Sequence, residues 1–215
     1  MRNISFVTGE IYHLFNRGTD KRQIFNNVCD LNRFIDSMRE FNTIDSIGSL
    51  YEKSFKQKND NVIKNKNKPL VEIICYCLNF NHYHIMLKQI MDAGISAFIK
   101  KLAGGYSCYF NHKYKRCGTL FEGPFKAKLI DSNDYLLRCA SYINLNNKVH
   151  KLGHQVAKLH KSSWDEYFGI TNKKICAKNI ILNQFKSIDE YRVFAEDALK
   201  DIIENKKSDR DFLDI

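Results

Sequence analysis

The sequence predicts an α+β protein in which helices pack against an antiparallel sheet. Short runs of aliphatic and aromatic residues bounded by Gly, Asn or Pro have the length of strands. Longer segments repeat their apolar residues every three or four positions, as amphipathic helices do. The chain has 215 residues, of which 44% are hydrophobic, so it has enough apolar material for one sizeable core.

The first half is expected to run strand, helix, strand, strand. Residues 11–16 (IYHLFN) form a short apolar run that ends at an Arg-Gly turn. Apolar residues at helical spacing predict a helix over 30–47 with one buried stripe. The runs 71–78 and 82–88 flank an Asn-Phe-Asn turn, and together they predict a hairpin.

The second half is expected to add a helix, a strand and another helix. Residues 93–113 have helical spacing, interrupted at Gly104-Gly105, and 119–130 resume strand character. Residues 131–147 begin with the N-capping types Asp and Ser and predict a helix. The first six elements, β-α-β-β-α-β, match a ferredoxin-like sheet with helices on one face. The last helix can lie against the remaining sheet surface.

The chain is expected to consist of a main domain and a C-terminal extension. Residues 1–150 form the main domain, and its lysine- and asparagine-rich stretch 51–70 is expected to be a flexible loop. Residues 151–215 form a helical C-terminal extension packed on the core. In this extension the capping-box pattern Ser187-x-x-Glu190 opens a helix.

The charge predicts a polyanionic partner. The formal net charge is +10, which favours nucleic acid first and an anionic membrane surface second, with a merely soluble basic protein as the alternative. No apolar run has the length of a membrane span and the N-terminus lacks a signal core, so we expect a cytoplasmic protein with no membrane partner. The seven cysteines include no CxxC pair and are interpreted as reduced thiols.

A histidine pair stands out in the second strand of the predicted hairpin, LNFNHYHIML. Side chains alternate along a strand, so His82 and His84 share one face, about 6.6 Å apart, while Tyr83 points the other way. Two imidazoles so placed can converge on a metal ion if a third ligand comes from elsewhere. The alternative is a pair of half-buried histidines bonded to backbone carbonyls.

The helix predicted over 131–147 carries a possible third ligand and a nucleophile. Tyr142 and Asn146 are four residues apart, so they lie one above the other on a helix surface, to one side of the apolar stripe. Asn146 has an amide oxygen, a hard ligand suited to Mg²⁺ or Mn²⁺. Tyr142 has a phenol that can attack phosphorus. Ordinary core packing is the alternative for Tyr142.

These residues carry a family resemblance. N81-H82-Y83-H84 together with Y142-I-N-L-N146 resembles the HUH single-tyrosine transposases of the IS200/IS605 type, and most closely the REP-associated tyrosine transposases. Supporting stretches are Y12-H-L-F-N-R-G18 and G118-T-L-F-E-G-P-F-K-A-K128. The resemblance covers about residues 9–153. The chain departs from the family where it has Asn79-Phe80 for Met-Pro and Asn147 for Pro.

The resemblance implies a chemistry. His82, His84 and Asn146 would bind a divalent cation, Mg²⁺ or Mn²⁺, against the scissile phosphodiester. Tyr142 would attack, leaving a 5′-phosphotyrosine and a free 3′-hydroxyl, so that strand transfer needs no ATP. The substrate implied is single-stranded DNA beside a hairpin. Family members act as monomers or homodimers, and both states stay open here.

Basic residues near aromatic residues suit a single strand, because cations follow the backbone and rings stack on unpaired bases. Tyr114 and Phe121 lie among the basic residues that precede and form the last predicted strand. A solvated strand edge with core aromatics is the alternative. The expected DNA-binding residues are Arg17, Lys21, Arg22, Lys113, Lys115, Arg116, Lys126, Lys128 and Arg138.

Two other functions compete with the enzyme. One is a domesticated protein that binds DNA hairpins but no longer transposes. The other is a structural zinc protein that uses the histidine pair and a nearby thiol such as Cys77.

Overall fold

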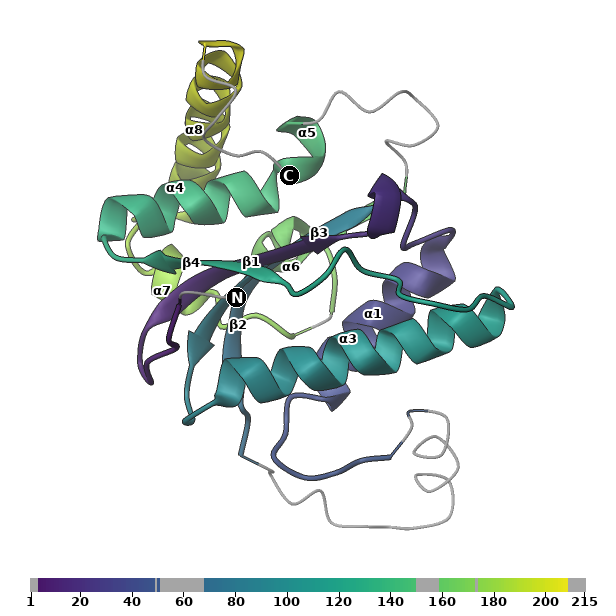
Figure 1. The fold of residues 1–215 in the computed structure, drawn as a ribbon. Coiled ribbons are helices and arrows are strands. Elements are labelled where there is room, and N and C mark those ends of the chain that lie inside the picture. Colours follow the sequence, from purple (N-terminus) through teal and green to yellow (C-terminus); the bar gives the residue numbers. More distant parts are fainter. Residues whose placement is uncertain (1–3, 49, 51–67, 150–158, 173, 209–215) are drawn as a thin grey trace.

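The computed structural model describes residues 4–48, 50, 68–149, 159–172 and 174–208 (Figure 1). The expected loop at 51–70 lies outside these residues except for its last three. The strands are β1 (Ile11–Arg17), β2 (Val71–Asn79), β3 (His82–Gln89), β4 (Lys126–Ile130) and β5 (His160–Ser162). The helices are η1 (Thr19–Lys21), α1 (Val28–Glu40), α3 (Gly94–Lys113), α4 (Asn133–Asn144), α5 (Asn146–Val149), α6 (Trp164–Tyr167), α7 (Asn179–Leu182) and α8 (Ile188–Ser208).

The strands form one antiparallel sheet in the order β4-β1-β3-β2-β5. The predicted α+β class and ferredoxin-like arrangement are confirmed. Helices α1 and α3 cover one face of the sheet, and α4, supported by α8, covers the other (Figure 1). Strand β5 was not expected. It adds a second edge from the C-terminal part of the chain, beside β2.

Several predicted elements differ from the observed ones. The strand expected over 119–130 is only β4, because the preceding residues cross the end of β1, where Glu122 N donates to Arg17 O at 2.8 Å. The helix expected over 30–47 ends at Glu40. Helix α3 runs through its glycine pair without a break. At Gly105 a Cβ would lie 2.7 Å from the Phe41 ring, so glycine lets the end of α1 pack closely on α3.

The C-terminal part packs on α4. The predicted capping box at the start of α8 is present in part: Glu190 N donates to Ser187 Oγ at 3.2 Å, but the Glu190 carboxylate accepts from Lys186 N instead of Ser187 N. From α8, the buried Tyr191 hydroxyl accepts a hydrogen bond from Asn144 at the end of α4. None of the described helices is long and apolar enough to cross a membrane.

A buried carboxylate links α1 to α3. Asp30 accepts hydrogen bonds from Lys113 Nζ at 2.6 Å and from the hydroxyls of Tyr114 and Tyr109 at 2.7 and 3.0 Å. Burial by itself raises the pKa of Asp30, but these hydrogen bonds, with one from the Asn26 backbone, outweigh it, so the pKa lies below its usual value. The charged form of this side chain therefore stabilises the fold.

Replacing Asp30 with alanine is expected to lower the free energy of unfolding at pH 7 by about 3 kcal/mol, because Lys113 and two hydroxyls lose a buried partner. The folded pKa is lower than the unfolded one, so this contribution is complete above the ordinary value of 3.8 and disappears as the pH falls through the folded value. Urea unfolding of both proteins at pH 7 measures the loss of stability, and the same comparison at pH 3 measures how much of the loss remains at low pH. Asp36 of α1, whose side chain is 45% exposed, is the control: Asp36→Ala should change stability by less than about 0.5 kcal/mol. Equal losses in the two variants would contradict this account.

Candidate active site

The histidine pair lies on the sheet face covered by α4. As strand alternation predicts, the rings of His82 and His84 are neighbours, with centroids 5.3 Å apart. Tyr83 points to the opposite face, where its ring packs against Phe34 and Phe121. The two imidazoles are therefore positioned by β3, at the centre of the sheet.

The ring of His82 is held at both nitrogens. Its Nδ1 lies 2.7 Å from Asn81 Oδ1, an atom that can only accept, so the His82 proton is on Nδ1. Its Nε2 therefore carries a lone pair, and it lies 2.9 Å from Asn79 Nδ2 and 3.3 Å from Asn146 Oδ1. This places a donor nitrogen of His82 next to the amide oxygen expected as a further ligand.

A third histidine, which sequence reasoning missed, lies beside His84. His13 Nε2 is 2.9 Å from His84 Nδ1, and the two rings stack with centroids 5.1 Å apart. Burial, and secondarily the charge of Lys128, lowers the pKa of His13 to about 3, so the ring is neutral near pH 7. Alternation along β1 would have placed His13 on the α4 face. The sequence did not show that β1 is the strand next to β3.

Tyr142 reaches the same place from α4. Its ring stands edge-on to His84 with centroids 5.4 Å apart, and 6.3 Å from His13. The side chain is only 3% exposed, and burial raises the pKa of Tyr142, an effect partly offset by a hydrogen bond with the Asn146 side chain. The phenol is therefore protonated near neutral pH. Its polar end lies beside Asn146.

Helix α4 is placed by its cap and its apolar stripe. Tyr135 N donates to the Ser132 side chain at 3.3 Å, so Ser132, one of the two predicted capping residues, is the N-cap. The predicted core residues Leu136, Cys139, Ala140 and Ile143 are all buried.

The expected stacking of Tyr142 and Asn146 on one continuous helix is not observed. Helix α4 ends at Asn144, Leu145 caps it, and Asn146 begins the short helix α5. This break directs the buried Asn146 side chain to the end of the β2–β3 hairpin, where it meets His82 and Asn79. The Tyr142 ring contacts His84, which is two residues further along β3 than His82.

The donor set fits a hard divalent cation that uses amide oxygen. Among the described residues, no group of three His, Cys, Asp or Glu side chains could hold a metal ion, so a third ligand must be of another type. Asn146 Oδ1 is such an atom, 3.3 Å from His82 Nε2. The zinc alternative fits less well, because among the described residues His82, His84 and Cys77 do not come together as a group that could hold a metal ion.

Two of the predicted DNA-binding residues flank this site. Lys126 and Lys128 lie exposed on the edge strand β4, opposite Phe15 and His13 of β1. Cross-strand partners share a face, so both lysines are on the face of the histidines. Lys126 Nζ lies 6.0 Å from the centre of the Phe15 ring. Together they give the site a positively charged edge.

The other predicted cations are spread out, and several are paired. Arg17 pairs with Glu122, Arg22 with Asp20, Lys113 with Asp30, and Arg138 with Asp134 and Asp201. Lys21 and Lys115 are exposed, and Arg116 lies over the Phe110 ring. The aromatic residues expected to stack on bases have other contacts: Phe121 is a buried core residue, and Tyr114 donates to Asp30.

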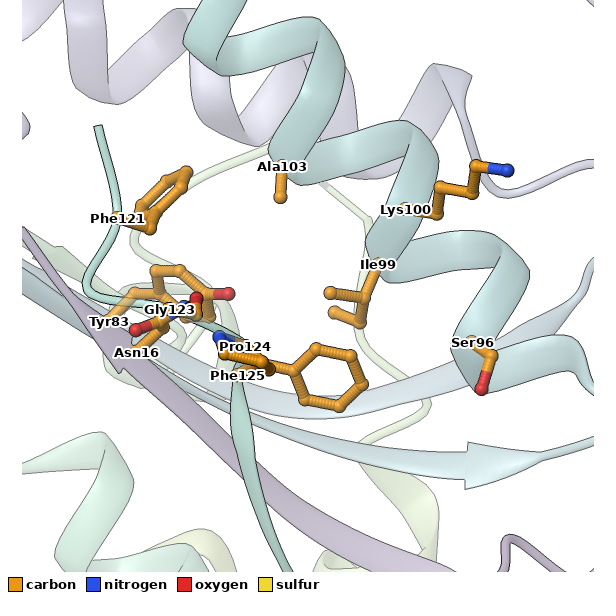
Figure 2. A pocket seen from close by; sticks show the side chains of 10 residues that line it. All are labelled: Asn16, Tyr83, Ser96, Ile99, Lys100, Ala103, Phe121, Gly123, Pro124 and Phe125. Carbon is orange, nitrogen blue, oxygen red and sulfur yellow. Dashed lines mark hydrogen bonds between the residues drawn. The ribbon is translucent and has the colours of Figure 1, made fainter. Parts of the chain in front are cut away.

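A separate pocket lies on the opposite side of the sheet. It has a volume of about 310 Å³ and is formed between α3 and residues 121–125 (Figure 2). Phe121, Phe125 and Tyr83 supply aromatic walls, Asn16 lies at its base, and the Lys100 amine points away from it (Figure 2). Because Tyr83 faces away from the histidines, this pocket is not part of the histidine–tyrosine site.

The site thus combines a histidine pair on an antiparallel sheet with a tyrosine that faces it from a helix. The family model for transposases of the IS200-like type matches residues 7–146, and the chain belongs to this family. No curated protein sequence matches the chain. A solved structure described as a REP-associated tyrosine transposase bound to a REP hairpin is similar, with 12% identity and a TM-score of 0.49. The similarity covers 81% of this chain and 88% of that one.

Proposed function

We propose that this transposase is a metal-dependent endonuclease and strand transferase that acts on single-stranded DNA beside hairpins, with Tyr142 as its nucleophile. One observation carries the proposal: the Asn146 side chain contacts both the Tyr142 hydroxyl and His82, while the Tyr142 ring contacts His84. A phenol, two imidazoles and an amide from separate segments therefore meet within a space that one phosphate group could bridge.

His82, His84 and Asn146 would hold the cation, Mg²⁺ or Mn²⁺. When bound, it would offset the negative charge on the phosphate oxygens and polarise the phosphorus. The tautomer of His82 suits this role, because Asn81 keeps the proton on Nδ1 and leaves the Nε2 lone pair facing Asn146.

Tyr142 would form one bond and break one. Its phenolic oxygen bonds to phosphorus and loses its proton, while the bond from phosphorus to the 3′ oxygen breaks and that oxygen takes up a proton. The products are a 5′-phosphotyrosine and a 3′-hydroxyl. A 3′-hydroxyl from another strand can reverse the step, because the ester keeps the energy of the original bond.

The burial of Tyr142 has a consequence for this step. With only 3% of its side chain exposed, the phenol is covered by α4 and the sheet. A phosphodiester would reach the phenol only after a local movement that uncovers it. Leu145, whose backbone departs from helical geometry at φ −109° and ψ 14°, separates α4 from α5 in this region.

Lys126 and Lys128 would guide the strand to the site. Replacing both with glutamine is expected to lower the slope of log affinity against log salt for single-stranded DNA by about 1.4, because each contacted phosphate contributes about 0.7. Fluorescence anisotropy at several salt concentrations measures this slope. Lys200→Gln on α8, where the lysine pairs with Asp197, should leave it unchanged. An unchanged slope in the double variant would show that Lys126 and Lys128 of β4 do not contact the phosphates of the bound DNA.

A domesticated protein that binds DNA hairpins without cleaving them is the second candidate, and the burial of Tyr142 favours it. The two functions are separated by incubating the chain with a labelled hairpin that has a single-stranded flank, with Mn²⁺ or with EDTA. The enzyme gives a Mn²⁺-dependent adduct that survives denaturing electrophoresis. Binding without an adduct supports the second function instead.

A further inference from the structure

Asn79 lies at the centre of the proposed metal site. It ends β2 and is the direct cross-strand partner of His82. Its side chain is fully buried, and Nδ2 lies 2.9 Å from His82 Nε2 and 2.7 Å from Asn146 Oδ1. One amide group thus donates to both lone-pair atoms that the proposed function assigns to the cation.

The three atoms form a compact triangle. Asn79 Nδ2 lies 2.9 Å from His82 Nε2 and 2.7 Å from Asn146 Oδ1, and the third side, from His82 Nε2 to Asn146 Oδ1, is 3.3 Å. Neighbouring ligands at right angles around Mg²⁺, with bonds of 2.0–2.1 Å, are separated by about 2.9 Å. The carboxamide of Asn79 therefore occupies a corner at which a ligand atom of such an ion would lie.

A half-turn of the carboxamide would exchange its two polar atoms. Oδ1 would then occupy the corner now held by Nδ2. The present contact of Oδ1 is weak, since it lies 3.8 Å from Cys77 Sγ. After the turn Nδ2 would face this sulfur, which is a weak acceptor, so little is lost on that side.

We propose that Asn79 is an additional ligand of the metal site. Without the ion, its NH₂ group joins His82 to Asn146 by hydrogen bonds. With Mg²⁺ or Mn²⁺ bound, its carboxamide turns and supplies Oδ1. The inference rests on the proposed function, because it requires the same cation site. It gives this chain a second amide oxygen, which favours hard ions.

The test compares Mn²⁺ affinities of full-length variants without DNA, with free Mn²⁺ measured by electron paramagnetic resonance. Asn79→Asp retains an oxygen at the corner and adds a charge, so it should bind Mn²⁺ at least as tightly as the unchanged chain. Asn79→Leu lacks the oxygen and should bind about tenfold more weakly. The matched control is Asn16→Asp, a buried asparagine on the other sheet face, which should leave the affinity unchanged.

The Asn79→Asp variant distinguishes a metal ligand from a residue that only positions its neighbours, even if Asn79→Leu does not fold. An aspartate cannot donate the two hydrogen bonds, so if Asn79 only positions its neighbours through its NH₂ group, Asn79→Asp will weaken binding as Asn79→Leu does. This result would overturn the inference and leave the metal site intact. If His82→Ala binds Mn²⁺ as tightly as the unchanged chain, the proposed site itself is wrong, and the inference is wrong with it.

Discussion

A Tyr142→Phe variant is expected to form no covalent adduct with DNA and to bind hairpin DNA with nearly unchanged affinity. One phenolic oxygen forms the ester, whereas many cations and hydrogen bonds hold the strand. The Phe ring preserves the edge-on contacts with His84 and His13, so the packing of α4 should persist. Denaturing electrophoresis measures the adduct, and fluorescence anisotropy measures the affinity.

Tyr135→Phe is the matched control for this variant. Tyr135 is on the same helix and is partly buried, and burial raises its pKa to about 12. After burial, the groups that raise this pKa are Cys139 and Asp131, not the histidines of the site. The Tyr135 variant should form the adduct at the normal rate. An adduct that persists in Tyr142→Phe but disappears in Tyr135→Phe would move the nucleophile to Tyr135.

The second large effect is expected for His82→Ala, which should lose cleavage and metal dependence together. Removing this imidazole deletes one proposed ligand and leaves the amide of Asn79 without one of its two acceptors. The initial rate of adduct formation should fall to background at all Mn²⁺ concentrations. Reduced cleavage that higher Mn²⁺ restores fully would mean that His82 is not essential to the site.

His112→Ala is the control for His82→Ala. His112 is exposed near the end of α3, on the helix that covers the other sheet face. Its removal should leave both the rate and its dependence on Mn²⁺ unchanged. A parallel loss in the two variants would indicate a general effect of histidine removal on folding.

Much of the fold could be predicted, because its elements have strong local patterns. The β2–β3 hairpin and helices α1, α3 and α4 follow from apolar periodicity and turn residues. Strand β5 could not be predicted, since it has three residues and depends on pairing with β2 far along the chain. The shortening of the strand at 119–130 has a similar origin: Glu122 and Phe121 bond to the end of β1 instead of continuing the ladder.

The site was predictable where a pattern lies within one element. Alternation along β3 places His82 and His84 on one face, and the apolar stripe of α4 leaves Tyr142 to one side. What depends on tertiary contacts was missed. The role of β1 as the neighbour of β3 brings in His13, and the helix break at Leu145 brings Asn146 to Asn79. Neither follows from spacing alone.

The most direct test of the account is to identify the residue that becomes joined to DNA. The adduct formed with Mn²⁺ and a hairpin substrate is digested with protease and nuclease, and the modified peptide is sequenced by tandem mass spectrometry. The account predicts a nucleotide 5′-phosphate on Tyr142. A phosphate on Tyr135, on Tyr83 or on a residue that is not tyrosine would contradict it.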